Sequence, residues 1–337
     1  MPAGWRWRHG AYRYRVPCGQ EDSWDGRGEV TLGKTLGEAQ QAWAAQAARL
    51  RTPGNTVAEL LDQYALRVVP AKAPKTQAAN AVALKRLRAV LGDVAIDDVL
   101  PPLVYRYFEE RPAKVAARRE LEVLRHAFTK AVEWGWVERH PFKGEVRLPR
   151  HAPRTRYVED WEIAECLALA SSRRGDATTV VQAYIRLKLA TGLRQGDLLR
   201  LRMGHLCEDG IHVQPHKTLH STGRRAVYLW TLERHAAVDA CLAARPCAVS
   251  QWLFCTRGGR PYVDEASGFA EAWKSLWRRF MARALAESKI TVPFTEHDLR
   301  AKAGSDAESL ERACQLLGHA DTAITERVYR RKPERIA

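Results

Sequence analysis

Two breaks in the sequence restrict how this chain can fold. The first is the TPGN stretch at residues 52–55, and the second is PFKGEVRLPRHAP at residues 141–153. Proline and glycine interrupt helices and strands, so regular elements are expected to end at both places. A chain of 337 residues is also too long for one small core. The breaks therefore predict three domains, over residues 1–52, 53–150 and 151–337.

The first segment has the pattern of a small sheet followed by a helix. Aromatic and basic residues alternate in WRWR (5–8) and YRYRV (12–16), which predicts strands with one charged face. Thr35 precedes an alanine-rich stretch that ends at Leu50, and Glu38 follows at the spacing of a capping box. Such a module could read DNA, or it could be a structural sheet with exposed arginines.

The middle segment has helical periodicity throughout. Thr56 is a candidate cap for a helix over 57–69, and further helices are expected over 76–91, after Pro101-Pro102, and over 114–134. Their basic residues suit a phosphate backbone, although a solvated helix face explains each charge equally well. These are Lys85, Arg86, Arg88, Arg118, Arg119 and Arg125.

The last segment is also rich in helical pattern, with strands expected at 211–213 and 226–229. The predicted fold class is therefore mainly α and multidomain (α+β). It comprises a small β-rich N-terminal module, a helical domain, and a helical domain with a small antiparallel sheet.

Charge and cysteine content narrow the functional classes. Lys and Arg outnumber Asp and Glu by 54 to 39, which gives a net charge of +15 and indicates a polyanionic partner or a merely basic surface. The seven cysteines form no CxxC pair, which argues against a disulfide framework or zinc ribbon. No signal peptide or membrane-spanning run is visible, so a soluble, cytoplasmic protein is expected.

Four stretches near the C-terminus carry the residue types of phosphoryl chemistry. They are ATGLRQGDLLRL (190–201), QPHKTLHSTGR (214–224), HDLR (297–300) and LLGHADTAITERVY (316–329). Singly, each arginine, lysine or tyrosine in them is explained by an ordinary surface or core position. Ordinary surface or core positions do not explain why all of these residues occur together and in this order.

In this order the stretches resemble the tyrosine recombinase family, the phage integrases and their relatives. The family's active site runs Arg, Lys, His-x-x-Arg, His or Trp, and then Tyr. The resemblance implies that these places are filled here by Arg194, Lys217, His297, Arg300, His319 and the nucleophile Tyr329. Tyr329 is also the only tyrosine after Tyr262, so it has no competitor in its segment.

These residue types suit attack on a phosphodiester. Arg194 and Arg300 can offer paired donors to the phosphate oxygens and stay charged at any working pH. His297 can help to remove the tyrosine proton, and Lys217, in a predicted hairpin turn, can protonate the leaving 5′ hydroxyl. A free tyrosine has a pKa of about 10 and needs such neighbours to react at neutral pH. The chemistry requires neither ATP, a metal nor another cofactor.

The resemblance also implies an architecture and partners. The module over 1–52 would bind arm-type DNA sites, and the helical domain over 53–150 would be a core-binding (SAM-like) domain. Four protomers would assemble on double-stranded attachment sites, with host or phage accessory factors, to integrate and excise a phage or mobile element. The expected location is the bacterial cytoplasm, at the nucleoid. Alternatives are a type IB topoisomerase-like strand relaxer and a non-catalytic DNA-binding relative.

Three details remain open. Tyr329 lies ten residues after His319, whereas many relatives have about nine, so the terminal segment is expected to be bent or phased differently. His212, His216 and His220 have a metal-like spacing, but Pro215 argues against a helix and hence against a metal site. Asp197 is expected to position basic neighbours, and Gly258-Gly259 to form a tight turn.

Overall fold

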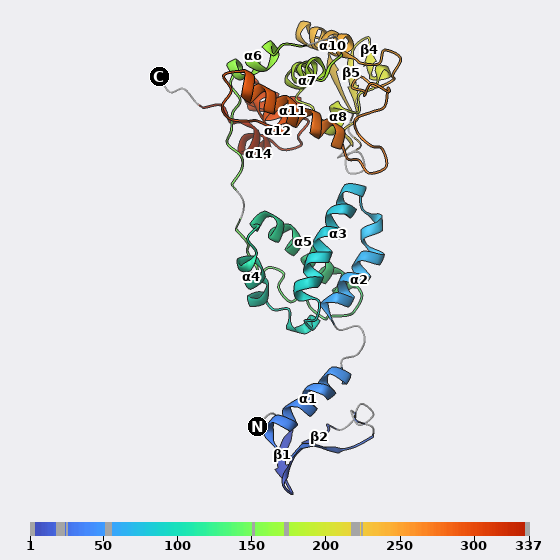
Figure 1. The fold of residues 1–337 in the computed structure, drawn as a ribbon, viewed down its shortest axis with the longest axis vertical. Coiled ribbons are helices and arrows are strands. Elements are labelled where there is room, and N and C mark those ends of the chain that lie inside the picture. Colours follow the sequence, from blue (N-terminus) through green and yellow to red (C-terminus); the bar gives the residue numbers. More distant parts are fainter. Residues whose placement is uncertain are drawn as a thin grey trace. The chain divides into compact units, whose positions relative to one another are not determined.

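The computed structural model describes residues 4–17, 24, 26–50, 56–149, 152–171, 175–216, 223 and 225–333; for residues 44–50 it describes the backbone alone. The chain divides into two compact units, Met1–Pro149 and Arg150–Ala337 (Figure 1). The predicted boundary near residue 52 lies outside the described residues, and the division into three functional domains stays a prediction. Within the described part, no helix is long and apolar enough to cross a membrane.

The N-terminal sheet has the predicted two-faced character. Its antiparallel strands are β1 (Trp5–Arg8), β2 (Ala11–Arg15) and β3 (Glu29–Gly33), and α1 (Leu36–Leu50) follows. Arg6 lies opposite Arg13 in the register, so the strand arginines share one face because side chains alternate along a strand. Tyr14, on the other face, packs its ring 4.5 Å from that of Trp43 of α1. The Thr35–Glu38 capping box before α1 is present.

The rest of the first unit consists of the four helices that the sequence predicts. They are α2 (Val57–Arg67), α3 (Pro74–Leu91), α4 (Pro101–Glu110) and α5 (Lys114–Glu133), with short 3-10 turns at Val69–Ala71 and Ile96–Asp98. Thr56 caps α2 through a capping box with Glu59. Leu60, Leu87 and Leu124 are among the fully buried residues of their common core.

The second unit contains helices around a small antiparallel sheet of order β4-β5-β6. Its strands are β4 (Leu206–Cys207), β5 (Gly210–Val213) and β6 (Ala226–Leu229), so both predicted strands are present. Its helices are α6 (Asp160–Ala168), α7 (Ala177–Thr191), α8 (Gln195–Leu198), α10 (Leu232–Ala244), α11 (Glu271–Glu287), α12 (Glu296–Ser305), α13 (Leu310–Leu317) and α14 (Thr322–Ile324). A 3-10 turn covers Met203–His205, and a single π-turn, Thr325–Tyr329, ends the regular structure. The predicted mainly α, α+β fold is confirmed.

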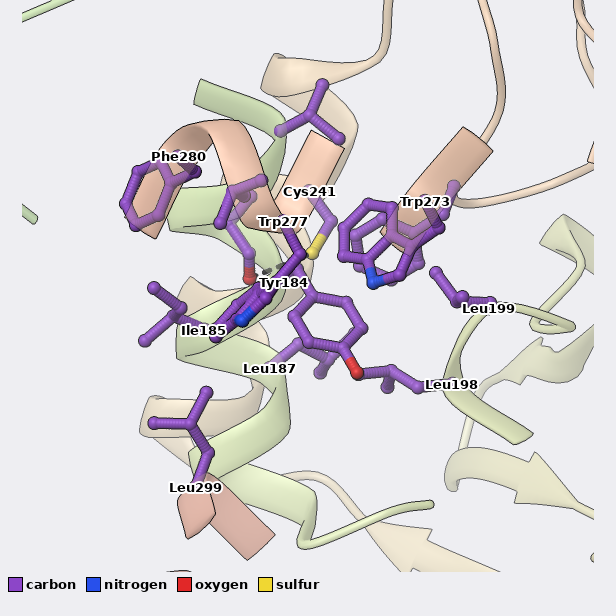
Figure 2. Packing of buried hydrophobic residues seen from close by; sticks show 14 of the residues in the cluster. Tyr184, Ile185, Leu187, Leu198, Leu199, Cys241, Trp273, Trp277, Phe280 and Leu299 are labelled. Atoms are coloured by element: carbon purple, nitrogen blue, oxygen red, sulfur yellow. Dashed lines mark hydrogen bonds between the residues drawn. The ribbon is translucent and has the colours of Figure 1, made fainter. Parts of the chain in front are cut away.

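The core of this unit is built around α7. α7 packs against α10, α11 and α12, and its Tyr184 is completely buried with its ring centroid 4.6 Å from that of Trp273 (Figure 2). Burying an aromatic side chain of this kind contributes roughly 1.5–3 kcal/mol. The C-terminal end of α7 and the start of α12 are thereby held on one rigid support.

Candidate active site

The turn after α7 presents Arg194. α7 ends at Thr191, and Gly192 has a φ of 61°, a left-handed conformation that glycine adopts without strain. The ammonium group of the buried Lys188 donates a hydrogen bond to the Leu193 carbonyl and fixes this turn. Arg194 then follows as the half-buried residue that precedes α8.

α12 carries His297 and Arg300 on one face. They are three residues apart, about one helical turn. The start of the helix is fixed by a capping box: the Thr295 amide donates to the Asp298 carboxylate at 2.9 Å, and the Asp298 amide donates to the Thr295 hydroxyl. Arg300 is buried, with 2% of its surface exposed, whereas His297 remains exposed at the helix start.

A hydrogen bond joins the turn that carries Arg194 to the start of α12. Gln195, the residue after Arg194, donates from Nε2 to Oε1 of Glu296, the residue before His297, at 2.7 Å. Trp273 donates to the other carboxylate oxygen at 2.9 Å. Burial raises the pKa of Glu296. Residues that are a hundred positions apart in sequence are therefore joined at the site.

Arg300 links three segments through its guanidinium group. It donates from Nη1 to the Gly192 carbonyl and from Nη2 to the Leu317 carbonyl, the latter at 2.6 Å. Nη2 also lies 3.0 Å from Nε2 of His319. Burial and the nearby charge of Arg194 lower the pKa of Arg300. Among the described residues, its buried Nε has no hydrogen-bond partner.

The network assigns the protonation of His319. α13 ends at Leu317, Gly318 caps it with a φ of 61°, and His319 follows. Because a guanidinium group only donates, Nε2 of His319 must accept from Arg300. Nδ1 then carries the proton and donates to the buried Thr325 hydroxyl at 2.8 Å. Burial, with the charges of Arg300 and Arg194, lowers the pKa of His319 to about 4, so the ring is neutral at pH 7.

Tyr329 lies among these side chains. Its ring centroid is 4.8 Å from that of His319 and 5.3 Å from that of His297, and Cζ of Arg300 is 5.4 Å from the ring centre. Only 8% of the tyrosine is exposed. Part of His297 faces solvent, but its ring is desolvated in this cluster. This desolvation, together with the smaller effect of the charges of Arg331 and Arg300, lowers the pKa of His297 to about 4.

A π-turn lies between His319 and the end of the regular structure. The Arg330 amide donates to the Thr325 carbonyl at 3.1 Å, an i→i+5 bond that encloses one more residue than an α-helical turn. That this turn compensates for the ten-residue spacing stays a prediction. Gly304 of α12 allows the buried Leu317 to pack closely beside this turn, since a Cβ at position 304 would lie 2.8 Å from Cδ1 of Leu317.

Lys217 lies outside the described residues, so its side chain is not placed. The segment before it is held by the buried Asp197, whose carboxylate accepts a hydrogen bond from the His216 amide at 2.9 Å. This contact is with a backbone amide, so the expectation that Asp197 positions basic side chains stays a prediction. His212 lies on strand β5 and not on a helix, His220 falls outside the described residues, and Gly259 forms the expected turn with a φ of 74°.

One group of possible metal ligands occurs among the described residues. Atoms of Cys207, Asp209 and His212 lie within 4.8 Å of one another around the β4–β5 turn. Asp209 is exposed, and its carboxylate is already 2.6 Å from Nε2 of His212. The histidine–aspartate pair explains this cluster without an ion. The described cysteines are all free.

Three buried polar residues that sequence reasoning did not single out support the site. Lys188 is 1% exposed, and burial together with the charge of Arg300 lowers its pKa to about 7. Thr325 is fully buried against His319. Ser305 donates a hydrogen bond to the Tyr329 carbonyl at 2.7 Å. In the sequence, Lys188 shares the otherwise largely apolar stretch YIRLKLAT of α7 with Arg186, and nothing in that stretch tells which of the two is buried; the structure exposes Arg186 and buries Lys188.

Comparison with known families and proteins gives a consistent result. The model of the phage integrase family matches residues 162–335, more than half of the chain. The tyrosine recombinase XerD of Caulobacter vibrioides is 25% identical over 221 residues, which cover 64% of this chain and 70% of that protein.

Solved structures share the fold. A lambda integrase tetramer bound to a Holliday junction has a TM-score of 0.66 at 21% identity, covering 99% of this chain and 97% of that one. The Tn1549 transposon integrase in complex with circular intermediate DNA has a TM-score of 0.62 at 16% identity, covering 80% and 94% of the two chains.

Proposed function

Because this chain belongs to the phage integrase family of tyrosine recombinases, we propose that it is a site-specific recombinase that integrates and excises a phage or another mobile element. The observation that carries the proposal is the convergence on Tyr329. His297, Arg300 and His319 contact or approach its ring, and Arg194 is close enough for its charge to lower the pKa values of Arg300 and His319.

In the proposed reaction, the Tyr329 hydroxyl oxygen attacks the phosphorus of one DNA strand. A phosphorus–tyrosyl oxygen bond forms, the bond to the 5′ oxygen breaks, and the strand is left with a 3′-phosphotyrosyl end. His297 takes the tyrosine proton, and Lys217 gives a proton to the departing 5′ oxygen. Attack by a 5′ hydroxyl of a second strand reverses each step, so the energy of the cut bond is kept.

The arginines would stabilise the transition state. Charge builds on the non-bridging phosphate oxygens as the fifth bond to phosphorus forms, and fixed donors aimed at it lower the barrier. Arg300 has a buried Nε without a partner among the described residues, and Arg194 is half-buried beside it. The arriving phosphate also adds negative charge next to His297 and His319, which raises both pKa values from about 4.

The rest of the chain supplies surfaces for the DNA duplex. On the N-terminal sheet, Arg6 and Arg13 face each other across β1 and β2. Arg13 is already paired with Glu29 at 3.3 Å, so the exposed Arg6, Arg8 and Arg15 of this face would be the arginines that meet phosphate. We propose that residues 1–52 bind arm-type sites, that residues 53–150 bind the core site, and that residues 151–337 carry out the chemistry.

We further propose that the protein works as a homotetramer on its attachment sites, in the bacterial cytoplasm and at the nucleoid. Exchange between two duplexes needs four strand cuts, hence four nucleophiles. The similar lambda integrase was crystallised as a tetramer bound to a Holliday junction. Accessory factors that bend DNA or set direction belong to the same proposal.

Two alternatives make different predictions. A type IB topoisomerase-like relaxer would relax supercoiled plasmid but would not join two attachment sites. A non-catalytic relative would bind DNA without forming a covalent bond, which does not suit a chain in which every catalytic place of the family is filled. An assay on supercoiled plasmids with paired sites separates all three when both recombinant products and plasmid relaxation are measured.

The direct test uses a nicked substrate from which the cleaved end diffuses away, so that the covalent complex accumulates. The wild-type protein should become attached to DNA through Tyr329, identified by peptide mapping. Tyr329→Phe should bind the same DNA with unchanged affinity and form no covalent complex. Attachment that persists in this variant would refute the assignment of the nucleophile.

A further inference from the structure

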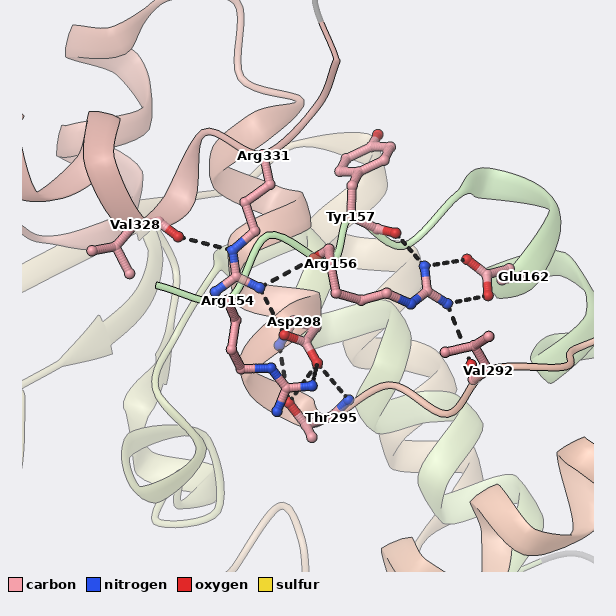
Figure 3. A network of polar contacts seen from close by, with 9 residues as sticks. All are labelled: Arg154, Arg156, Tyr157, Glu162, Val292, Thr295, Asp298, Val328 and Arg331. Carbon is pink, nitrogen blue, oxygen red and sulfur yellow. Dashed lines mark hydrogen bonds and ion pairs between the residues drawn. The ribbon is translucent and has the colours of Figure 1, made fainter. Parts of the chain in front are cut away.

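The residue two positions after Tyr329 is an arginine with a buried side chain. Only 4% of the Arg331 side chain is exposed. Its Nη1 lies 2.7 Å from the Asp298 carboxylate and 3.1 Å from the Arg156 carbonyl, and its Nε donates to the Val328 carbonyl at 2.9 Å (Figure 3). Every one of these contacts fixes the segment that carries Tyr329.

Asp298 is the fixed end of this contact. It is completely buried on α12, between the positions of His297 and Arg300. Burial acts to raise the pKa of Asp298, but hydrogen bonds from Thr295 and the charges of Arg331 and Arg154 outweigh it and hold the pKa below its usual value. The carboxylate is therefore ionised at neutral pH and attracts Arg331.

Two further contacts make the join rigid. The Arg331 amide donates to the Ser305 hydroxyl at 2.7 Å, and the same hydroxyl donates to the Tyr329 carbonyl at 2.7 Å. The Asp298 carboxylate also forms an ion pair with Arg154, whose Nη2 lies 3.1 Å from Oδ2. Arg154 belongs to the extended segment that precedes α6. Figure 3 shows both arginines reaching the one carboxylate from different segments. α12 thus holds the Tyr329 segment by two of its side chains, the Asp298 carboxylate, which binds the Arg331 side chain, and the Ser305 hydroxyl, which binds the backbone of Tyr329 and Arg331.

We infer that the buried Asp298–Arg331 ion pair positions the proposed nucleophile: it holds the end of the π-turn against α12 so that Tyr329 stays beside His297 and Arg300. This inference rests on the proposed function and adds two positioning residues to it. Neither residue contacts the reacting atoms in this role. They act through the backbone of residues 329–331.

Unlike an ion pair that only stabilises the fold, this pair also holds the segment that carries Tyr329. Removing one partner of a buried pair leaves an uncompensated charge, and the segment that bears the arginine can relieve this by moving outward. A displacement of about 1 Å at a reacting group costs up to roughly 100-fold in rate. The loss is therefore expected first in the presentation of Tyr329 and only secondarily in the fold.

The test compares Arg331→Ala with Arg330→Ala in the full-length protein. Arg330→Ala removes the same charge one residue earlier, from an exposed side chain that donates a hydrogen bond to the Ala307 carbonyl at 2.8 Å. Hydrogen exchange of the 322–333 backbone is measured by mass spectrometry, together with the rate of covalent attachment to nicked DNA and the DNA affinity.

Arg331→Ala is expected to speed exchange in residues 325–331 and to slow attachment by roughly ten- to a hundredfold, with DNA affinity within about twofold. Arg330→Ala should match the wild type. Arg331→Lys, which keeps the charge but loses the donors to Val328 and Arg156, should lie between them and guards against misfolding of the alanine variant.

Equal exchange and equal attachment in the two alanine variants would overturn the inference. So would faster exchange spread evenly over α7 and α11, because that pattern marks general destabilisation. If the wild type fails to attach to DNA, the proposed function fails, but the exchange comparison still decides whether the ion pair holds the segment.

Discussion

Replacing Thr325 with valine tests how His319 is held. Valine has nearly the same shape as threonine but lacks the hydroxyl that accepts the hydrogen bond from Nδ1 of His319 at 2.8 Å. Thr325 is fully buried, so water does not replace the lost acceptor. The substitution therefore removes one hydrogen bond and little packing.

The expected size of the effect follows from this burial. Leaving a buried N–H group unsatisfied costs about 1–3 kcal/mol. Moving the proton from Nδ1 to Nε2 does not avoid this cost. The Nε2–H group would then face Nη2 of Arg300, which is 3.0 Å away and is also a hydrogen-bond donor. Either way the pairing of His319 with Arg300 weakens. At about 1.4 kcal/mol per tenfold change, attachment to DNA should slow roughly five- to 150-fold.

The assay is single-turnover attachment to nicked DNA, with DNA affinity measured separately. Thr325→Ser is the matched control, because it keeps the hydroxyl and loses only a methyl group, and it should react close to the wild-type rate. The reasoning is refuted if the valine variant reacts as fast as wild type. It is also refuted if the serine and valine variants are equally slow, since packing would then be the cause.

Three other outcomes are expected. Gly304→Ala would place a Cβ 2.8 Å from Cδ1 of the buried Leu317. Because the overpacking cost of about 1–3 kcal/mol exceeds the helix-propensity gain of about 1 kcal/mol, we expect a lower Tm and slower attachment. An unchanged Tm with normal attachment would contradict this. The pKa of His319 falls from 6.5 to about 4 on folding, so the unfolded state binds protons first as the pH drops through this window and stability is lost there. Thermal melts should show this loss between pH 6.5 and pH 4 and a smaller loss in His319→Gln; identical slopes would count against it. Attachment should proceed in EDTA, and a strict need for Mg²⁺ would point to a nuclease instead.

Local signals in the sequence predicted the fold well. The capping box at Thr35 and the candidate cap Thr56 marked helix starts that the structure has, and the prolines at 101–102 marked another. Alternation in residues 5–8 predicted a sheet whose register does bring the arginines to one face. These signals work because capping and side-chain alternation depend only on neighbours in the chain.

The supporting residues of the site were not predictable in the same way. Thr325 and Ser305 are ordinary small polar residues in the sequence, and their importance comes from contacts with His319 and Tyr329. The spacing after His319 indicated that the last segment must differ in phase, but nothing local specified a π-turn. Such a turn is stable only where tertiary contacts hold it.

The π-turn ties the direction of Tyr329 to the length of the backbone before it. The Arg330 amide bonds to the Thr325 carbonyl, so residues 325–330 form one closed turn. Deleting one residue between 320 and 324 would shift this turn by one position relative to His319, which corresponds to a rotation of about 100° for a helical side chain. Tyr329 would then face away from His319, although every proposed catalytic side chain would still be present.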